Sequence, residues 1–492
     1  MRNSIYVMLL LLGLSSCVDL DEAPKSNLTT NQFYNNEDDA VAAVNAIYHR
    51  MFTNTEGMLA SGVLFNRQLM MYEMATDDYT AGPRTRSAQV VEMSKLNHSA
   101  SNIAIEYAWE YTYQAINLAN IAIARIAQIS SENINDSIRL RLINEAKFLR
   151  GWNYFNLVRW HGEVPLILHE TTTLDDASIH PAQSTEEKVY EQIISDFKDA
   201  ESLPAPSEYT GSDIGRATSG AAKAFLIKVY ITRQEWQKAA DKAHELIGLK
   251  WYDLFENYAD VFAPEKKNGI EHIFSEQFEG ADGYTSHRLA QTTAPSESPF
   301  NGDYVDAPNH SSGLFESFSE NDTRKYVTFA KQLTDPLTGK TVILSEVHFN
   351  KYWDKTTPYN QAKSSINVPI IRYADVLLMY AEALNELEDR ENAYTYLDKV
   401  RERAKIASLK SVAPDLDKDA LRDSIFQERR KEFTLEYQRW FDLARRGSDE
   451  YVKALKAAGK TNAAARHIHF PIPQRELDAN PSLHQLTDWV SY

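Results

Sequence analysis

The chain has 492 residues, a formal net charge of −17 and a hydrophobic content of 43%. An acidic surface repels phosphate backbones, so the charge argues against nucleic acid as a partner. The hydrophobic content is ample for a large core. After residue 16, no segment is apolar for the roughly 20 residues that a transmembrane helix needs.

The N-terminus has the pattern of a bacterial lipoprotein signal. Arg2 supplies a positive charge, residues 5–14 form a short apolar run, and two serines precede Cys17, the only cysteine of the chain. A lone cysteine has no partner for a disulfide, and the apolar run is too short to span a bilayer. We therefore expect residues 1–16 to be a signal peptide and Cys17 to carry the acyl chains that anchor the protein. The alternative is an ordinary cleaved signal with a chance cysteine.

The segment behind the cysteine is polar and acidic, and Pro24 discourages regular structure within it. We interpret residues 17–40 as the lipidated cysteine and a tether. Beyond the tether we expect one compact body. It comprises an N-terminal helical region over residues 41–215 and a C-terminal helical region with ligand loops over residues 216–492.

Helical periodicity dominates the rest of the chain. Apolar residues at spacings of three and four predict helices over residues 38–51, 109–129, 138–160, 186–203 and 219–233. The two stretches 219–248 and 373–404 each predict a helix, a short turn and a second helix. Such pairs cannot cover their own apolar faces and must stack on neighbours, as in tetratricopeptide repeats. The sequence thus predicts a predominantly all-α fold: a tetratricopeptide-like helix-pair solenoid with long irregular loops and little strand.

The stacked helix pairs admit two interpretations, a concave peptide-binding groove or a buried core, and we favour the core. Trp109, Trp152 and Trp160 lie in apolar helical frames, where an aromatic side chain is more often core than ligand platform. A charged motif near the C-terminus is interpreted as architectural rather than as an anion site. Its residues are placed on one helical stretch, with opposite charges three and four positions apart: Arg429, Arg430, Glu432, Arg439 and Asp442.

Motifs of the common catalytic sites are missing from the sequence. It contains no Gly-rich phosphate loop, no H-E-x-x-H and no G-x-S-x-G. With 69 Asp and Glu residues, an imagined pair of carboxylates has no weight as evidence for glycoside hydrolysis. His467 and His469 alternate, and an exposed strand or loop explains them better than a metal site. The sequence predicts no enzyme, no cofactor and no metal.

Two long segments, residues 76–101 and 279–321, interrupt the helical pattern and are rich in Gly, Pro, Ser and Asn. Irregular segments on a rigid frame are where binding residues concentrate. From these segments we choose five candidate ligand-binding residues: Asp78, Arg84, Asn97, Tyr284 and Tyr304. The aromatic stretch 351–353 is a further candidate, which we interpret as structural.

Three stretches are too specific for periodicity to explain. They are residues 145–166 (EAKFLRGWNYFNLVRWHGEVPL), residues 372–386 (RYADVLLMYAEALNE), and residues 428–433 (ERRKEF) running on to 439–443 (RWFDL). They resemble the SusD/RagB-like family of outer-membrane nutrient-binding lipoproteins. The ending, FPIP at residues 470–473 with NP at 480–481, is similar as well.

The resemblance implies a protein of the outer membrane that is exposed at the cell surface, captures glycan fragments and caps a SusC-like TonB-dependent transporter. Aromatic faces and planar polar groups, which sugars require, occur in both irregular segments. Family binding residues have no motif to align on, so none of the five candidates is carried over by the resemblance. Two alternatives stay open: a tetratricopeptide-type protein-binding scaffold lipoprotein, and a surface glycosidase.

Overall fold

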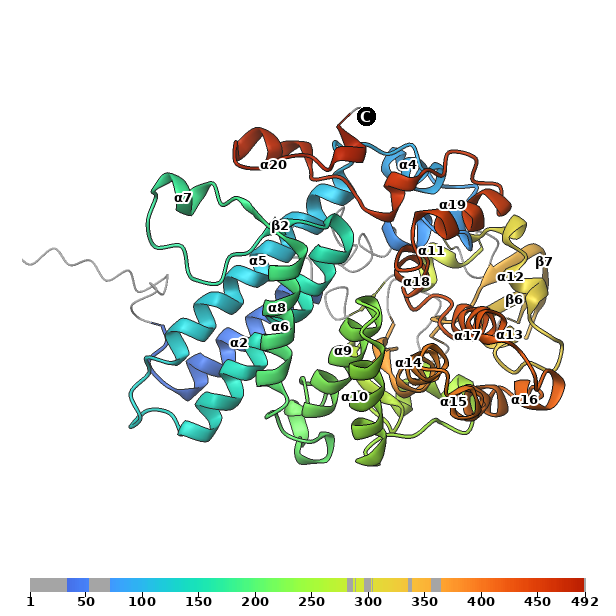
Figure 1. Ribbon diagram of the computed structural model, residues 1–492, viewed down its shortest axis with the longest axis horizontal. Helices are drawn as coiled ribbons and strands as arrows, with labels where there is room; N and C mark the ends of the chain where they lie inside the picture. The colour runs from blue at the N-terminus through green and yellow to red at the C-terminus, as the bar shows by residue number, and fades with distance from the viewer. Residues whose placement is uncertain are drawn as a thin grey trace, which may run out of the picture.

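The computed structural model describes residues 33–52, 71–280, 286–287, 289–295, 302, 304–334, 339–354 and 364–490. The signal peptide, Cys17, most of the tether and Tyr284 lie outside the described residues. Within them helices predominate and strands are short, which confirms the predicted fold class (Figure 1).

The two longest helices described, α5 (Ile103–Ile126) and α6 (Asp136–His161), lie side by side on the left of Figure 1. Helix α5 begins earlier than predicted because Asn102 caps it, its side chain accepting a hydrogen bond from the backbone N–H of Ala104. Asn135 caps α6 in the same way through Ser137. Both helices otherwise follow the predicted apolar pattern.

The frame continues as a series of packed helices. Helix α6 packs on α8, α8 on α9, α9 on α10, α10 on α14, and α14 on α15. Their bounds are α2 (Glu37–Phe52), α8 (Glu186–Ala200), α9 (Ser219–Thr232), α10 (Trp236–Gly248), α14 (Tyr373–Glu386) and α15 (Arg390–Arg403). Each corresponds to a predicted helix, and the two predicted helix pairs are α9–α10 and α14–α15.

One apolar core runs through this frame, from Ala40 in α2 to Leu397 in α15, and it crosses the predicted boundary at residues 215 and 216. Phe148 lies at its centre, with its ring centroid 5.5 Å from that of Phe197 and 5.6 Å from that of Phe225. Trp109, Trp152 and Trp160 are all buried, as predicted. The paired helices therefore bury their facing surfaces against one another.

The remaining helices belong mainly to the right-hand part of Figure 1. They are α4 (Ala88–Lys95), α7 (Asp176–Ile179), α11 (Leu289–Thr293), α12 (Leu314–Ser317), α13 (Lys325–Thr328), α16 (Leu409–Val412), α17 (Lys418–Glu432), α18 (Arg439–Ala444), α19 (Ser448–Ala457) and α20 (Gln474–Ala479). Helices α4, α11 and α12 lie in the two segments predicted to be irregular, so that prediction was only partly right.

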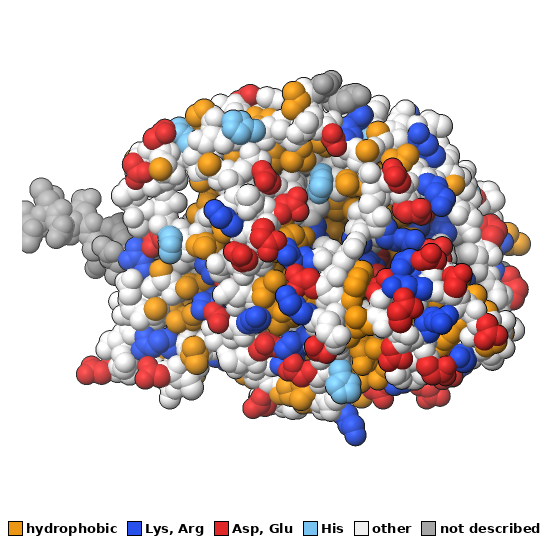
Figure 2. All heavy atoms as spheres, viewed as in Figure 1, with side chains coloured by type: hydrophobic (Ala, Val, Ile, Leu, Met, Phe, Trp, Pro, Cys, Tyr) orange, Lys and Arg blue, Asp and Glu red, His pale blue; other side chains and the backbone are white. Residues whose placement is uncertain are grey.

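The strands of the described residues form four antiparallel pairs of two strands each. The pairs are β1 (Tyr79–Ala81) with β5 (Asp306–Pro308), β2 (Val164–Pro165) with β3 (Gln183–Ser184), β4 (His272–Glu276) with β8 (Val368–Arg372), and β6 (Phe329–Thr334) with β7 (Thr341–Phe349). The hairpin β6–β7 lies at the right edge of Figure 1. Figure 2 shows the surface of the same face, with side chains of both charges interspersed.

The charged motif of residues 429–442 does not form one helix, so this part of the prediction is wrong. Helix α17 ends at Glu432, and the backbone then takes left-handed conformations at Leu435 (φ 67°) and Tyr437 (φ 59°) before α18 begins. The break lets Glu432 and Glu436 turn to Arg372 rather than to Arg439.

The prediction of an exposed strand or loop is also wrong for His467. It lies in a short 3-10 helix, Ala465–Ile468, and is buried with its ring centroid 5.4 Å from that of His98. Burial lowers the pKa of both imidazoles to about 3.

Candidate functional site

The two irregular segments predicted to carry the site come together in the structure. Strand β1 pairs with β5, and beyond the strands the backbone N–H of Gly82 donates to the carbonyl of Val305 at 2.8 Å. The Thr85 hydroxyl donates to the same carbonyl at 2.7 Å across 220 residues of sequence. We call this surface, residues 77–87 with residues 304–309, the loop ledge.

The ledge requires a glycine at position 82. A Cβ added to Gly82 would lie 2.3 Å from the carbonyl oxygen of Tyr304, which is closer than any side chain tolerates. The two backbone segments therefore approach more closely here than a residue with a side chain would allow. This close approach places the exposed Arg84 beside the second segment, where it donates to the carbonyl of Gly302 at 3.4 Å.

Two buried carboxylates fix the ledge to the C-terminal helices. Asp77 accepts hydrogen bonds from Arg439 at 2.9 and 2.6 Å, and Asp78 accepts from Nε of Arg430 at 2.9 and 3.1 Å. Burial alone would raise the pKa of Asp77, but Arg439 and then Arg430 lower it to about 2. Both pairings are of the strong, bidentate kind that sets orientation as well as distance.

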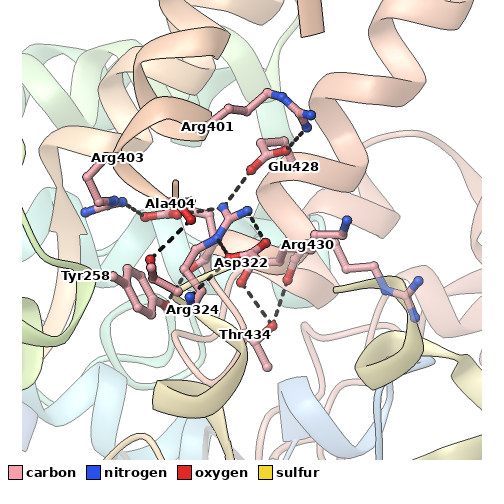
Figure 3. A network of polar contacts seen from close by, with 12 residues as sticks. Tyr258, Asp322, Arg324, Arg401, Arg403, Ala404, Glu428, Arg430 and Thr434 are labelled. Carbon is pink, nitrogen blue, oxygen red and sulfur yellow. Dashed lines mark hydrogen bonds and ion pairs between the residues drawn. The ribbon is translucent and has the colours of Figure 1, made fainter. Parts of the chain in front are cut away.

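A larger network of buried charges underlies these anchors. Figure 3 shows Arg324 between Asp322 and Glu428, with Arg401 reaching Glu428 from the other side. Arg324 lies 2.8 Å from Asp322 and 2.6 Å from Glu428. The charged motif predicted to be architectural therefore supports the ledge from below.

Arg372 forms the second node of this network. It contacts Glu271 and Glu432 at 2.6 Å and Glu436 at 2.7 Å, and all four side chains are buried. Burial opposes the charged form of Glu432, but Arg403, Arg372 and Arg324 together hold its pKa well below its usual range. Glu271, Glu432 and Glu436 are thus each paired with Arg372.

Aromatic side chains lie beside the ledge. The rings of Tyr304 and His348 are 4.0 Å apart between centroids, and Nε1 of Trp353 donates to the hydroxyl of Thr293 at 3.3 Å. Tyr304 is only 5% exposed, so its ring supports the ledge more than it faces solvent. As predicted for the stretch 351–353, Lys351 is structural, pairing with Glu436 at 2.7 Å.

The structure brings together some of the predicted site residues and separates others. Arg84 is exposed, whereas Tyr304 and Asp78 are buried in the same ledge, with Asp78 held by Arg430. Asn97 is also exposed, but it lies beyond the opposite end of α4 from Arg84, an eight-residue helix of about 12 Å. The roles of these residues in binding stay predictions.

His348 and Asp77 were not chosen from the sequence. His348 lies on β7, whose sequence TVILSEVHF is rich in β-branched residues, which is a strand signal. Asp77 directly precedes the chosen Asp78, and its distant partner Arg439 gives no local signal in the sequence.

The described residues contain neither a metal site nor a membrane-spanning helix. Over the described part of the chain, no three His, Cys, Asp or Glu side chains are grouped as metal ligands would be. In the same residues no helix has both the length and the apolarity to cross a membrane.

Stacked helix pairs that carry a surface built from two distant loops define a helical binding scaffold. Comparison with known proteins identifies the family within this class. Residues 246–489 match the model of the SusD family, and residues 20–231 match a model described as "Starch-binding associating with outer membrane". The chain belongs to the SusD family.

Relatives of similar length support this assignment. SusD-like protein P25 from Formosa agariphila is 27% identical over 541 aligned residues, covering 98% of this chain and 97% of the relative. A crystal structure of a SusD superfamily protein from Bacteroides vulgatus superimposes with a TM-score of 0.78 at 24% identity, covering 93% of this chain and 100% of the other. Surface glycan-binding protein A from Bacteroides thetaiotaomicron, solved with laminarihexaose, gives 0.75 at 20% identity, with 91% and 99% covered.

Proposed function

We propose that this protein is an outer-membrane lipoprotein, exposed at the cell surface, that binds glycan fragments and delivers them to a SusC-type TonB-dependent transporter. The observation that carries the binding role is the loop ledge, in which two irregular segments 220 residues apart are hydrogen-bonded into one surface on a rigid frame. Membership of the SusD family supports the same role.

The chemistry of the ledge suits a saccharide. Sugar rings bind through aromatic or apolar contact on their C–H faces and through planar polar groups on their hydroxyls. Arg84 is the exposed planar donor, and the buried rings of Tyr304 and His348 lie against each other within the same region. We propose that Arg84 contacts the ligand and that Tyr304 holds the ledge in shape.

A binding role fits the carboxylates better than hydrolysis does. A glycosidase needs one carboxyl group free to donate a proton and a second free to act as base or nucleophile. Near the ledge Asp77 and Asp78 are each held by an arginine, and Glu73, whose pKa burial raises to about 8, is enclosed by the fold with only 3% of its surface exposed. We propose that the protein binds its glycan without cleaving it.

Incubation with a panel of polysaccharides tests both statements. Because a structural neighbour was solved with laminarihexaose, β-glucans of that type come first, followed by chemically different glycans. We expect retention of one class in affinity electrophoresis, with no increase in reducing ends. New reducing ends would indicate a glycosidase, and retention of peptides but of no glycan would indicate a protein-binding scaffold.

Paired arginine variants locate the site. Arg84→Ala should weaken binding of the retained glycan by about 0.5–1.5 kcal/mol, the usual contribution of a hydrogen bond. Arg475→Ala is the matched control, since this side chain is 69% exposed on α20. Equal binding by both variants would place the glycan elsewhere, and Asn97 would be the next position to change.

The anchor and the transporter need separate tests. Cys17→Ala should give a folded protein that no longer partitions with membranes, and continued membrane association would exclude lipidation as the anchor. Extraction of outer membranes in mild detergent should recover the protein with a large transporter, through an interface above roughly 1,600 Å². Recovery as a lone monomer in several detergents would argue against the partnership.

A further inference from the structure

A second hollow surface lies away from the loop ledge, between α6, α9 and α18. Two adjoining open hollows share Arg159 and Phe441 and so form one groove. Figure 2 shows a recess near the middle of the face, between the helices on the left and α18 on the right. We call it the central groove, lined by Trp152, Asn156, Arg159, Thr232, Gln438 and Phe441.

Helix geometry explains why these side chains share one wall. Trp152, Asn156 and Arg159 follow one another at spacings of four and three on α6, which places them on one face of the helix. Phe441 faces them from α18, which begins directly after Gln438.

Arg159 is the unusual group of this groove. Its guanidinium lies between two aromatic rings, with Cζ 3.7 Å from the centroid of Phe155 and 3.6 Å from that of Phe441. Nε donates to the carbonyl of Phe155 at 2.9 Å and Nη2 to Oδ1 of Asn156 at 2.6 Å, and both acceptors are neutral. An arginine has five N–H donors, so most of its capacity is unused by the described residues.

Neighbouring arginines have carboxylate partners, whereas Arg159 has none among the described residues. Arg150 on the same helix pairs with Asp196 at 2.7 Å, and Arg445 on the groove's far side pairs with Asp442 at 3.0 Å. Among the described residues no carboxylate forms an ion pair with Arg159. Burial lowers the pKa of Arg159 to about 10, which leaves it protonated at neutral pH. A partly buried cation without a partner is costly unless a ligand supplies the anion, and Arg159 is only partly exposed.

The other charged residues of the first cavity are already paired. Lys228 contacts Asp375 at 2.7 Å, and Glu436 contacts Arg372 at 2.7 Å. Glu186 lines the second cavity only. The first cavity therefore presents one open positive charge among aromatic rings.

We infer that the central groove binds a carboxylated sugar, a uronate, with its carboxylate on Arg159 and its ring against the aromatic wall. Arginine pairs with carboxylates through parallel hydrogen bonds, and Nδ2 of Asn156 is available for a hydroxyl. Aromatic side chains line the groove beside Arg159 and suit the C–H face of a ring rather than an inorganic anion, and the choice of a saccharide rests on the proposed function.

Calorimetry with matched ligands tests this site. Short oligogalacturonates should bind the wild-type protein, and galactose oligomers of equal length should not bind in the groove. Arg159→Gln should weaken oligogalacturonate binding by about 10- to 100-fold, as expected for a lost charged hydrogen bond. Thr232→Trp fills the second cavity without removing the charge and should have a similar effect, which keeps the test decisive if Arg159→Gln does not fold.

Further variants separate this inference from the proposed function. Arg84→Ala and Arg475→Ala should leave oligogalacturonate binding unchanged, whereas Arg159→Gln and Thr232→Trp should leave binding at the loop ledge unchanged. Uronate binding that survives Thr232→Trp, or is lost in Arg84→Ala, overturns the inference. Displacement of the uronate by equimolar acetate or sulfate would reduce the site to a simple anion site and overturn it as well. Uronate binding without any ledge ligand would support the groove and contradict the proposal that the loop ledge is the glycan site.

Discussion

The helical frame and the region beneath the loop ledge are equally buried but are held together by different chemistry. In the frame, Phe148 and its neighbours bury apolar surface, which is non-directional and tolerates small shifts. Beneath the ledge, Arg324, Arg372 and Glu432 are just as inaccessible, yet each is stable only while its partners are in place. The comparison teaches that the loop ledge depends mainly on directional contacts, and the frame mainly on apolar packing.

The largest expected effect is at the centre of the ion-pair network. Arg372→Met removes the partner that Glu271, Glu432 and Glu436 share. The free energy of unfolding should therefore fall by about 3–5 kcal/mol at pH 7. Chemical denaturation measures this change. A loss below 1 kcal/mol would mean that the network contributes little.

Phe148→Ala is the matched change in the frame and should cost a similar 3–5 kcal/mol or so through the cavity it leaves. The two variants should differ in their response to pH. Arg372 is one of the arginines that hold the pKa of Glu432 below its usual 4.5, so the stability it contributes is present above pH 4.5 and is lost as the pH falls, and the loss in Arg372→Met shrinks accordingly. The loss in Phe148→Ala should stay constant, and parallel curves would contradict the comparison.

The next effect concerns the anchor of the ledge. The folded-state pKa of Asp77, about 2, is below its ordinary value of 3.8, so its pairing stabilises the fold above pH 3.8 and the benefit is lost as pH falls towards 2. Asp77→Asn should therefore cost about 2 kcal/mol at pH 7. The same variant should lose part of its acid sensitivity between pH 4 and 2, which denaturation at several pH values would reveal. It should also weaken glycan binding, although Asp77 is buried.

The helical frame could be predicted from the sequence because a helix depends on residues only three and four positions apart. Spacings of three and four placed α2, α6, α8 and α9 to within a few residues, and apolar context placed Trp152 and Trp160 in the core. The ledge could be predicted only as two separate loops. Its anchors join Asp78 to Arg430 across 352 residues, and no periodicity reports a partner at that distance.

The break between α17 and α18 could not be predicted from the sequence, for a related reason. The residues after Glu432 have no glycine or proline to mark the end of a helix, and Leu435 and Tyr437 take left-handed conformations. Such conformations persist when tertiary contacts over-determine them, as the pairing of Arg372 with Glu436 does here. Tertiary contacts thus overrode local preference.

A smaller effect is expected at a buried carboxyl that has no arginine. Glu276 on β4 is 0% exposed, and neither carboxyl oxygen has a hydrogen-bond partner among the described residues. Burial raises the pKa of Glu276 well above its ordinary 4.5. The protonated carboxyl therefore leaves the fold at full stability below pH 4.5, and the protein loses stability as the pH rises above 4.5. Glu276→Gln should raise the free energy of unfolding by about 1 kcal/mol at pH 8 and change little at pH 4. A destabilised variant at pH 8 would show that the carboxylate has a partner.

The smallest effect is expected at a surface ion pair. Arg125 contacts Glu170 at 2.9 Å, but both side chains are partly exposed. Arg125→Ala should change stability by less than about 1 kcal/mol, and added salt should reduce even that. A loss as large as that of Arg372→Met would show that burial does not set the strength of these pairs.

The pairing of β1 with β5 has a consequence for the order of folding. Closing a loop of some 220 residues has an entropic cost before any contact rewards it, whereas the α5–α6 hairpin forms between neighbours in the sequence. Helices should thus appear early in refolding, and the amide of Gly82 should gain protection from hydrogen exchange late. An exported chain would then complete its scaffold first and become competent to bind only in the last step.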